Sequence, residues 1–356
     1  MPLSKIQFGN TGRRNLVING AMQVAQRNGT SVTQAPHNGY AGPDRWKTFV
    51  SGGGAYTITQ DSGHQADTGH DKALKLAVTT ADTSIAATDV YSFLTRIESN
   101  SLQHLQYGTA SAKSITFSFW VRATKTGTQA VFFSKQGTGT DYNHIKEFTI
   151  NASNTWEHKT ITIPGLTAST MVNDASTYLQ VGWILKYGSN YHGTKDTWTT
   201  NGHFTTANAV NNMDSTSNTF YITGVQLEVG DTATDFEHRS FAEELLLCKR
   251  YYTQIQGGSD AFTFPGKGQG STTVDGVFPL SVPLRAQPTM NSIASRFFTD
   301  SGFSSTTATP TANQFQANND VLAINIGSYS GGASFTNNES GVWGVQNTTL
   351  TIDAEL

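Results

Sequence analysis

Short runs of alternating apolar and polar residues constrain the fold of this chain more than any other feature. In ITFSFWVRA, residues 115–123, one face of a strand carries four apolar side chains: Ile115, Phe117, Phe119 and Val121. A period of two is that of a half-buried β-strand. Similar runs follow at 130–134, 158–163, 179–185 and 220–228, separated by clusters rich in Gly, Asn, Ser and Thr. Many short strands with such turns predict a β-sandwich or jelly roll.

Composition and charge exclude several classes of protein. Charged residues make up 14% of the chain and the net charge is −3, so we expect no nucleic-acid partner. No run approaches the ~18 apolar residues of a membrane span, so we expect no membrane insertion. The N-terminal residues MPLSKIQFGNTGRRN lack the apolar core of a secretory signal. The single Cys248 leaves no internal disulfide.

One segment breaks the β pattern and carries the strongest helix signal of the chain. Ser240 and Glu243 have the spacing of a capping box, and Gly257 follows the end of the apolar stripe. We therefore expect a helix over residues 240–256. Its apolar surface covers most sides, which predicts burial against the neighbouring β-domains or against copies of itself. The side chains expected in that interface are Phe241, Leu245, Leu246, Leu247, Tyr251 and Tyr252.

These patterns predict an all-β protein with four parts. Residues 1–14 form a polar, basic arm, and residues 15–239 form an N-terminal jelly-roll β-sandwich. Residues 240–256 form one connecting helix, and residues 257–356 form a smaller C-terminal β-sandwich.

A search for catalytic chemistry gives little. His64, Asp67, His70 and Asp71 are metal-ligand types, but their stretch HQADTGHD fits a solvated turn better than a metal site. The glycine-rich residues 266–271 lack the spacing of a phosphate loop, and no nucleophile elbow occurs. The acidic residues in 227–238 precede a helix start, where negative charge is favourable. We predict no enzyme activity, no cofactor and no metal.

The aromatic residues divide between core and surface. Trp183 shares a face with Leu179 and Val181, which predicts core packing. Trp120 points away from the apolar face of its strand and is expected to cover a second layer or to meet a neighbouring chain. Tyr191 and Trp198 lie in a polar, turn-rich stretch, where they either anchor the loop or contact a ligand.

Three stretches together resemble the tail-fibre and receptor-binding proteins of bacteriophages. They are NLVINGAMQVAQRNGT (15–30), DRW (44–46) and ITGVQLEVGDTATDFEHRSFAEELLLCKRYY (222–252). The resemblance implies a homotrimer with the helix on its threefold axis, and an N-terminal arm that docks onto other tail or neck proteins of the virion. It also implies assembly in the host cytoplasm, location in the virion tail, and contact with a glycan or protein of the host surface.

Residues 15–235 also resemble the jelly-roll carbohydrate-binding modules of secreted glycanases. Asn15, Leu16, Asn19 and Gly20 fit the opening pattern of those modules. Gln23 and Gly224 replace acidic residues that commonly bind a structural calcium in them, which leaves no metal expected here.

Our leading hypothesis is a non-enzymatic tail fibre that mediates host recognition and adsorption through exposed loops. The expected contacts, in a C-terminal unit farthest from the docking arm, are Arg296, Phe297, Phe298, Asp300, Phe303, Tyr329 and Phe335, with Tyr191 and Trp198 as the competing surface. Phe side chains buried at the trimer axis are the alternative for the first set. Alternative functions are a structural fibre or decoration protein of tail or head without receptor binding, a carbohydrate-binding module, and a depolymerase.

Overall fold

The alternation at residues 115–123 forms strand β7 (Ile115–Ala123), as predicted. In the computed structural model its four apolar side chains are fully buried, whereas Trp120 and Arg122 on the other face are half-buried. The structure describes residues 13–257, 262–269, 272–299, 302–308, 310–314, 321–327 and 340–356. The chain divides into two compact units, residues 1–244 and 245–356.

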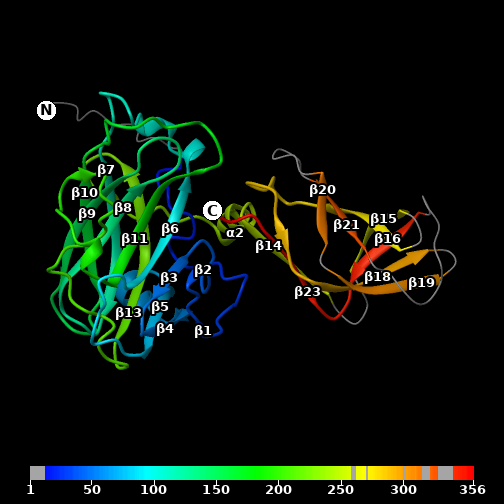
Figure 1. Cartoon of the computed structure of the whole chain (residues 1–356), viewed down its shortest axis with the longest axis horizontal. Coiled ribbons are helices and arrows are strands. Elements are labelled where there is room, and N and C mark those ends of the chain that lie inside the picture. Colours follow the sequence, from blue (N-terminus) through cyan, green and yellow to red (C-terminus); the bar gives the residue numbers. More distant parts are fainter. Residues whose placement is uncertain are drawn as a thin grey trace, which may run out of the picture. The chain divides into compact units, whose positions relative to one another are not determined.

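The first unit is a sandwich of two antiparallel sheets (Figure 1). The six-stranded sheet has the order β1 (Thr33–Gln34), β4 (Ala55–Ser62), β5 (Lys72–Thr80), β13 (Thr219–Val229), β7 and β10 (Glu157–Ile163). The seven-stranded sheet has the order β12 (Trp198–Thr199), β9 (Tyr142–Ile150), β8 (Gly127–Lys135), β11 (Thr177–Tyr187), β6 (Val90–Glu98), β3 (Lys47–Ser51) and β2 (Asn38–Tyr40). The predicted all-β sandwich is confirmed.

The core of this unit fills the space between the two sheets. Trp183 from β11 stacks on Phe93 from β6 at 5.2 Å and lies 5.2 Å from Phe117 of β7. Trp46 lies 5.7 Å from Trp183 and is fully buried. The prediction that Trp183 belongs to the core is therefore confirmed.

A smaller apolar cluster covers the outer face of the seven-stranded sheet. Phe132 from β8 and Tyr187 from β11 are buried there beneath residues of the long connection between β11 and β13. Tyr191 and Phe204 from that connection pack against the cluster. This connection therefore occupies part of the sheet face instead of leaving it open.

The helical elements of the first unit are short. They are α1 (Gln65–Thr68) and the 3-10 turns η1 (Ser99–Ser101), η2 (Gln103–Leu105) and η3 (Ser189–Tyr191). The long helix is α2 (Phe241–Lys249), and the boundary between the two units falls within it.

The predicted helix over 240–256 is too long. It ends at Lys249, and residues 252–256 form strand β14 (Tyr252–Gln256). Strand β14 pairs with β23 (Thr349–Asp353), near the C-terminus, from Tyr252↔Asp353 to Gln256↔Thr349. Tyr252 and Thr253 favour a pleated strand once a partner strand supplies the hydrogen bonds.

Beyond the end of α2, the described residues of the second unit form strands and their connections. One sheet has the order β14, β23 and β17 (Thr289–Met290). The larger sheet has the order β19 (Gly302–Ala308), β18 (Ile293–Thr299), β22 (Ser340–Val345), β15 (Phe262–Gln269), β16 (Thr273–Pro279), β21 (Val321–Ile326) and β20 (Thr311–Gln314). Its core contains Trp343, Phe297 and Ile324, all fully buried.

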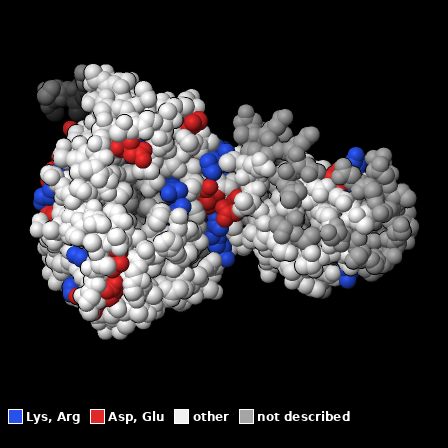
Figure 2. Space-filling view, viewed as in Figure 1, with Lys and Arg blue, Asp and Glu red and all other residues white. Residues whose placement is uncertain are grey.

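The surface carries little charge. On the face drawn in Figure 2, most of the jelly roll is neither acidic nor basic, in keeping with a charged content of 14%. Within the described ranges, no helix has the length and apolar character needed to cross a membrane.

Candidate functional site

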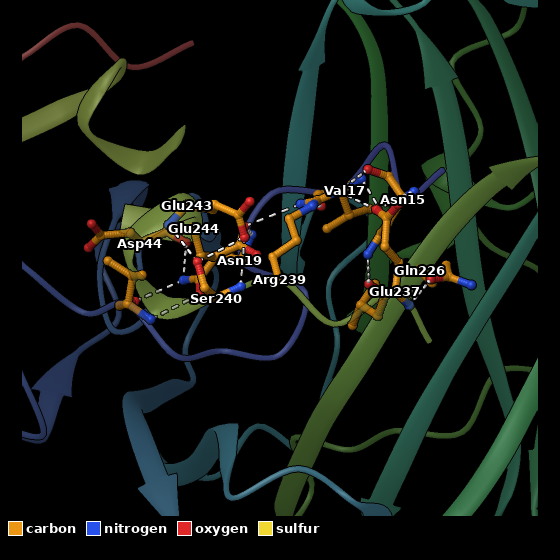
Figure 3. Close-up of polar contacts among 12 residues, drawn as sticks. Asn15, Val17, Asn19, Asp44, Gln226, Glu237, Arg239, Ser240, Glu243 and Glu244 are labelled. Atoms are coloured by element: carbon orange, nitrogen blue, oxygen red, sulfur yellow. Dashed lines mark hydrogen bonds and ion pairs between the residues drawn. The ribbon is translucent and has the colours of Figure 1, made fainter. Parts of the chain in front are cut away.

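A network around Arg239 holds the connecting segment against the start of the jelly roll (Figure 3). The guanidinium of Arg239 donates to the carbonyl oxygens of Val17 and Asn15, to the first at 3.2 Å. It also pairs with Glu237 at 3.0 Å and with Glu244 at 3.4 Å. Because the Arg239 side chain is 8% exposed, these bonds satisfy a nearly buried charge.

Glu237 ties the network to the first described residues of the chain. Its two carboxylate oxygens accept from the backbone N–H groups of Arg14 at 2.8 Å and Asn15 at 3.0 Å. Burial alone raises the pKa of Glu237, but these two donors and Arg239 outweigh it and hold the pKa below its usual value. Arg14 is thus part of the folded unit, not of the predicted free arm, whose residues 1–12 lie outside the described ranges.

The acidic stretch that begins at the end of β13 also makes contacts within the first unit. Glu228 accepts from the backbone N–H of Thr234 at 2.8 Å and from its hydroxyl at 2.7 Å. The amide oxygen of Gln226 accepts from the backbone N–H of Glu237 at 2.8 Å. These side chains fold the polar elbow between β13 and α2, which accounts for them without a catalytic role.

The predicted capping box of α2 is present. The Glu243 carboxylate accepts from the backbone N–H of Ser240 at 2.9 Å, and the Ser240 hydroxyl accepts from the N–H of Glu243 at 3.3 Å. The Ser240 hydroxyl also donates to the Glu243 carboxylate at 2.8 Å. The two bonds that the carboxylate accepts from Ser240 lower the pKa of Glu243, since they favour the charged form.

The sequence resembles carbohydrate-binding modules that commonly bind calcium, but the residues at the corresponding positions do not fit a hard cation. Gln23 is exposed, and Gly224 carries no side chain. Gly224 has φ +57°, and a Cβ there would lie 2.6 Å from the His70 ring, so an Asp is not accommodated. His64 instead bonds Asp61 at 2.9 Å. Across the described ranges, no three His, Cys, Asp or Glu side chains are placed to hold a metal ion.

The first unit has a ligand-sized hollow of about 480 Å³, which we call the amide hollow. It follows η2, and its lining residues are Gln103, Gln106, Tyr107, Thr109, Ser111 and Met171. None of these side chains is charged. Pockets of roughly 300–1,000 Å³ accommodate small ligands, so the volume suits one or two sugar rings.

Local sequence explains the shape of this loop. Leu102 and Leu105 are fully buried and anchor the 3-10 turns, which leaves Gln103 exposed between them. Gln106 then turns the chain in the left-handed region with φ +55°. Gly108 has φ +84°, and a Cβ there would lie 2.2 Å from the carbonyl oxygen of Ser169, so the two loops approach only because this residue is glycine.

Tyr107 is the most informative residue of the amide hollow. It is 3% exposed, and its hydroxyl is buried without a hydrogen-bond partner in the structure. Its ring lies 6.4 Å from those of Tyr178 and Trp198, which fix its position. Burial raises the pKa of Tyr107, with a smaller contribution from Tyr178, so the hydroxyl stays a neutral donor. A buried hydroxyl without a partner is costly. Because this hydroxyl exposes almost no surface, a ligand in the hollow would supply the missing bond only after the lining side chains move.

The sequence did not single out the amide hollow. Gln103, Gln106 and Tyr107 lie in a polar stretch between two strands, and two glutamines three residues apart beside a tyrosine are the only local signal. Burial of the tyrosine depends on Tyr178 and Trp198, which come from other strands.

Trp198 and Tyr191 both pack against other residues of the first unit. Trp198 packs against the main core and donates from its indole N–H to the carbonyl of Pro164 at 2.9 Å. Tyr191 lies 5.2 Å from Tyr187 in the outer cluster. Of the two, Trp198 supports the amide hollow from behind through Tyr107.

The candidates in the second unit are partly described. Arg296, Phe297 and Phe298 lie in strand β18, not in a loop as predicted, and Phe297 is fully buried. Buried and half-buried residues alternate from Ile293 to Phe298, a pattern that pairing with β19 and β22 imposes. Phe303 lies in β19, and Asp300, Tyr329 and Phe335 lie outside the described residues.

The six residues predicted for a trimer interface separate into three groups by exposure. Phe241 is 55% exposed and Leu246 is 43% exposed, while Leu245 and Leu247 are half-buried. Tyr251 and Tyr252 are 3% and 5% exposed in the single chain, so they are not available to a neighbouring copy.

Comparison with known proteins gives structural neighbours only. No protein-family model matches the sequence, and no curated protein matches it. The enzymatically active domain of tailspike protein 4 of bacteriophage CBA120 aligns with 60% of this chain at a TM-score of 0.31 and 11% identity, and 21% of its own length is covered.

Two further neighbours are sugar-binding proteins by description. A family 11 carbohydrate-binding module of a Clostridium thermocellum cellulase aligns at a TM-score of 0.30 and 10% identity over 59% of this chain and 99% of the module. A putative sugar-binding protein from Bacteroides thetaiotaomicron aligns at 0.34 and 12% over 61% of this chain and all of that one. Likeness at these TM-scores does not carry over what those proteins bind or cleave. The sandwich architecture rests on this chain's own strands.

Proposed function

We propose that this chain is a non-enzymatic virion appendage of the tail-fibre kind, and that its jelly roll binds a neutral sugar of a host-surface glycan in the amide hollow. The observation that carries the glycan-binding part is the Tyr107 hydroxyl, buried and without a partner at an uncharged polar hollow. The virion part rests on the sequence resemblance of residues 15–30, 44–46 and 222–252.

The chemistry of the amide hollow favours a sugar over other small ligands. The side-chain amides of Gln103 and Gln106 each offer donors and an acceptor, and Thr109 and Ser111 add hydroxyls. A sugar presents hydroxyl groups that both donate and accept, together with C–H faces that pack on Tyr107 and Met171. Without a charged lining residue, an ionic ligand would gain no pairing there.

The trimer is part of this proposal. Phe241 and Leu246 leave large apolar surfaces exposed on α2 in the single chain. Two further copies of the same helix would cover these surfaces around a threefold axis.

The glycan proposal is tested by screening the purified full chain on an array of bacterial surface glycans and then titrating the best neutral oligosaccharide calorimetrically. Tyr107→Phe removes one hydrogen bond and should weaken binding by about 1 kcal/mol, roughly fivefold. Tyr178→Phe is the matched control, because the Tyr178 hydroxyl is also buried and unpartnered but does not line the hollow. Equal affinities of the two variants would overturn the assignment of the hollow.

The non-enzymatic part has its own test. The chain is incubated with the selected polysaccharide, and new reducing ends are measured over time. We expect none. Release of oligosaccharides would revive the depolymerase alternative, whereas an array without a single binder would favour a structural fibre or decoration protein.

A further inference from the structure

The outer face of the six-stranded sheet gathers aromatic and basic side chains that the core does not use. Trp120 of β7 is paired with His158 of β10, and Arg122 of β7 is paired with Tyr221 of β13. Trp156 precedes β10 and lies 6.2 Å from Tyr221. We call Trp120, Arg122, Trp156, His158 and Tyr221 the Arg122 platform. Three of them, Trp120, Arg122 and Trp156, are half-buried, and His158 is exposed.

Two aromatic rings hold the guanidinium of Arg122. Its central carbon lies 4.1 Å from the ring centroid of Tyr221 and 5.2 Å from that of Trp156. Cation–π contacts of this length hold a guanidinium in place. Tyr221 is 7% exposed, so the ring beneath Arg122 is itself fixed by the sheet.

Arg122 has no acidic partner among the described residues, and its Nε is buried without a hydrogen-bond acceptor. Asp61, which lies on the same sheet face, is already engaged by His64 at 2.9 Å and by Lys75 at 3.9 Å. Lys75 also lies 5.5 Å from the Tyr221 ring, but Asp61 lies 3.9 Å from its ammonium and offsets its charge. The positive charge that an anion on the platform would meet is therefore that of Arg122.

The geometry favours a carboxylate on a sugar ring over a simple anion. A guanidinium held by ring faces keeps its edge N–H groups free, and their fork matches the two oxygens of a carboxylate. Trp120 lies two residues along the same strand face, about 6.6 Å away at roughly 3.3 Å per residue. That spacing places a half-buried indole beside the anion, where the apolar C–H face of a pyranose packs. Inorganic phosphate has no such face.

We propose that the Arg122 platform binds uronic-acid residues of an acidic polysaccharide, with the sugar carboxylate on Arg122 and the sugar ring on Trp120. The proposal goes beyond the neutral-sugar site, because the platform and the amide hollow share no residue. It gives the jelly roll a second contact for extended, charged glycan chains.

The test titrates the full chain calorimetrically with a hexamer of galacturonic acid, beside the same hexamer fully methyl-esterified and beside inorganic phosphate. We expect the acid hexamer to bind, with the methyl ester and phosphate at least about tenfold weaker, because only the first combines carboxylate and ring. Binding of the methyl ester or of phosphate with equal affinity would overturn the assignment, as would no binding of the acid hexamer.

Variants then locate the site. Arg122→Gln and Trp120→Ala should each weaken hexamer binding about tenfold or more, and Arg122→Lys should recover only part of the loss, since Lys lacks the planar fork. Lys113→Gln removes one charge at an exposed position outside the platform and should leave affinity within about twofold. Thermal melting shows whether each variant is folded. If Arg122→Gln does not fold, the comparison is made with Arg122→Lys.

Two results would contradict the platform. Equal losses in Lys113→Gln and Arg122→Gln would indicate non-specific attraction of a polyanion. An unchanged affinity in both Arg122 variants would place the hexamer elsewhere. Tyr107→Phe should leave uronate binding unchanged. The proposal for the amide hollow and the proposal for the platform can therefore be refuted independently of each other.

Discussion

The backbone N–H of Asn19 donates a 2.5 Å hydrogen bond to a carboxylate oxygen of Glu244, across 225 positions of sequence. The same oxygen lies 3.4 Å from the guanidinium of Arg239. The first turn of α2 is thereby fastened to the segment that opens the jelly roll. The long motif at residues 222–252 therefore has a structural role. It completes the sandwich and holds the start of α2 in place.

This relationship predicts a large effect of removing the carboxylate. Glu244→Ala leaves the Asn19 N–H and the Arg239 charge without their partner, and should destabilise the first unit by about 3 kcal/mol. Glu244→Gln keeps an acceptor for Asn19 and should cost less than half as much. Urea unfolding followed by tryptophan fluorescence measures both. Equal, small losses would show that the network does not hold the unit together.

The proposed trimer depends on the exposed face of α2. Leu246→Asp should convert the trimer into monomers, because an unpaired carboxylate in an apolar contact is strongly unfavourable. Val32→Asp is the matched control, since Val32 is 68% exposed and lies in the jelly roll. Light scattering after size-exclusion chromatography reports the mass of each. A wild-type monomer, or a Leu246→Asp trimer of unchanged stability, contradicts the axial role.

The N-terminal arm is expected to attach the protein to the virion. Because Arg14 belongs to the folded network, the deletion must stop at residue 12. The truncated chain should keep its melting temperature and oligomeric state but be absent from purified particles, as measured by immunoblotting. Normal incorporation of the truncated chain would refute the arm's role.

His70 should make the first unit sensitive to acid. It lies 4.6 Å from Phe236 and 5.3 Å from His238, and burial, with smaller contributions from His238 and His158, lowers its pKa from 6.5 to about 4. As pH falls below 6.5, the unfolded chain binds this proton before the folded chain does. Stability is therefore fully present above pH 6.5 and is lost between pH 6.5 and about 4, by up to about 3 kcal/mol.

His144 adds to the same loss, since burial also lowers its pKa to about 4. The urea midpoint should therefore decrease less between pH 7.5 and pH 4.5 in His70→Gln than it does in the wild type. The exposed His37→Gln should behave as the wild type does. An identical fall in all three proteins would exclude His70 as a source of the acid sensitivity.

Sequence reasoning predicted the strands that carry their own pattern. The alternation from Ile115 to Val121 and the apolar face around Trp183 correctly identified core strands, because burial on one face leaves a period of two. The capping box at Ser240 was equally local and equally correct.

Prediction from the sequence failed where the pairing strand or packing partner lies far away along the chain. Tyr252 continues the helical stripe of Phe241 and Cys248, yet it forms a strand because β23 lies about 100 residues later and supplies the ladder. Phe297 was expected in a recognition loop. It lies instead in a core, because its strand pairs with strands that the local sequence does not reveal. Tyr107 showed no periodic signal at all, since the amide hollow is made by loops that meet only in the folded unit.

The proposed binding of a neutral host sugar in the amide hollow can be seen directly in a crystal structure of the full chain with the strongest oligosaccharide from the array. We expect a sugar ring among Gln103, Gln106 and Tyr107, with a sugar hydroxyl about 2.8 Å from the Tyr107 oxygen. A sugar bound elsewhere on the chain, or a hollow that contains only water at saturating sugar, would contradict it.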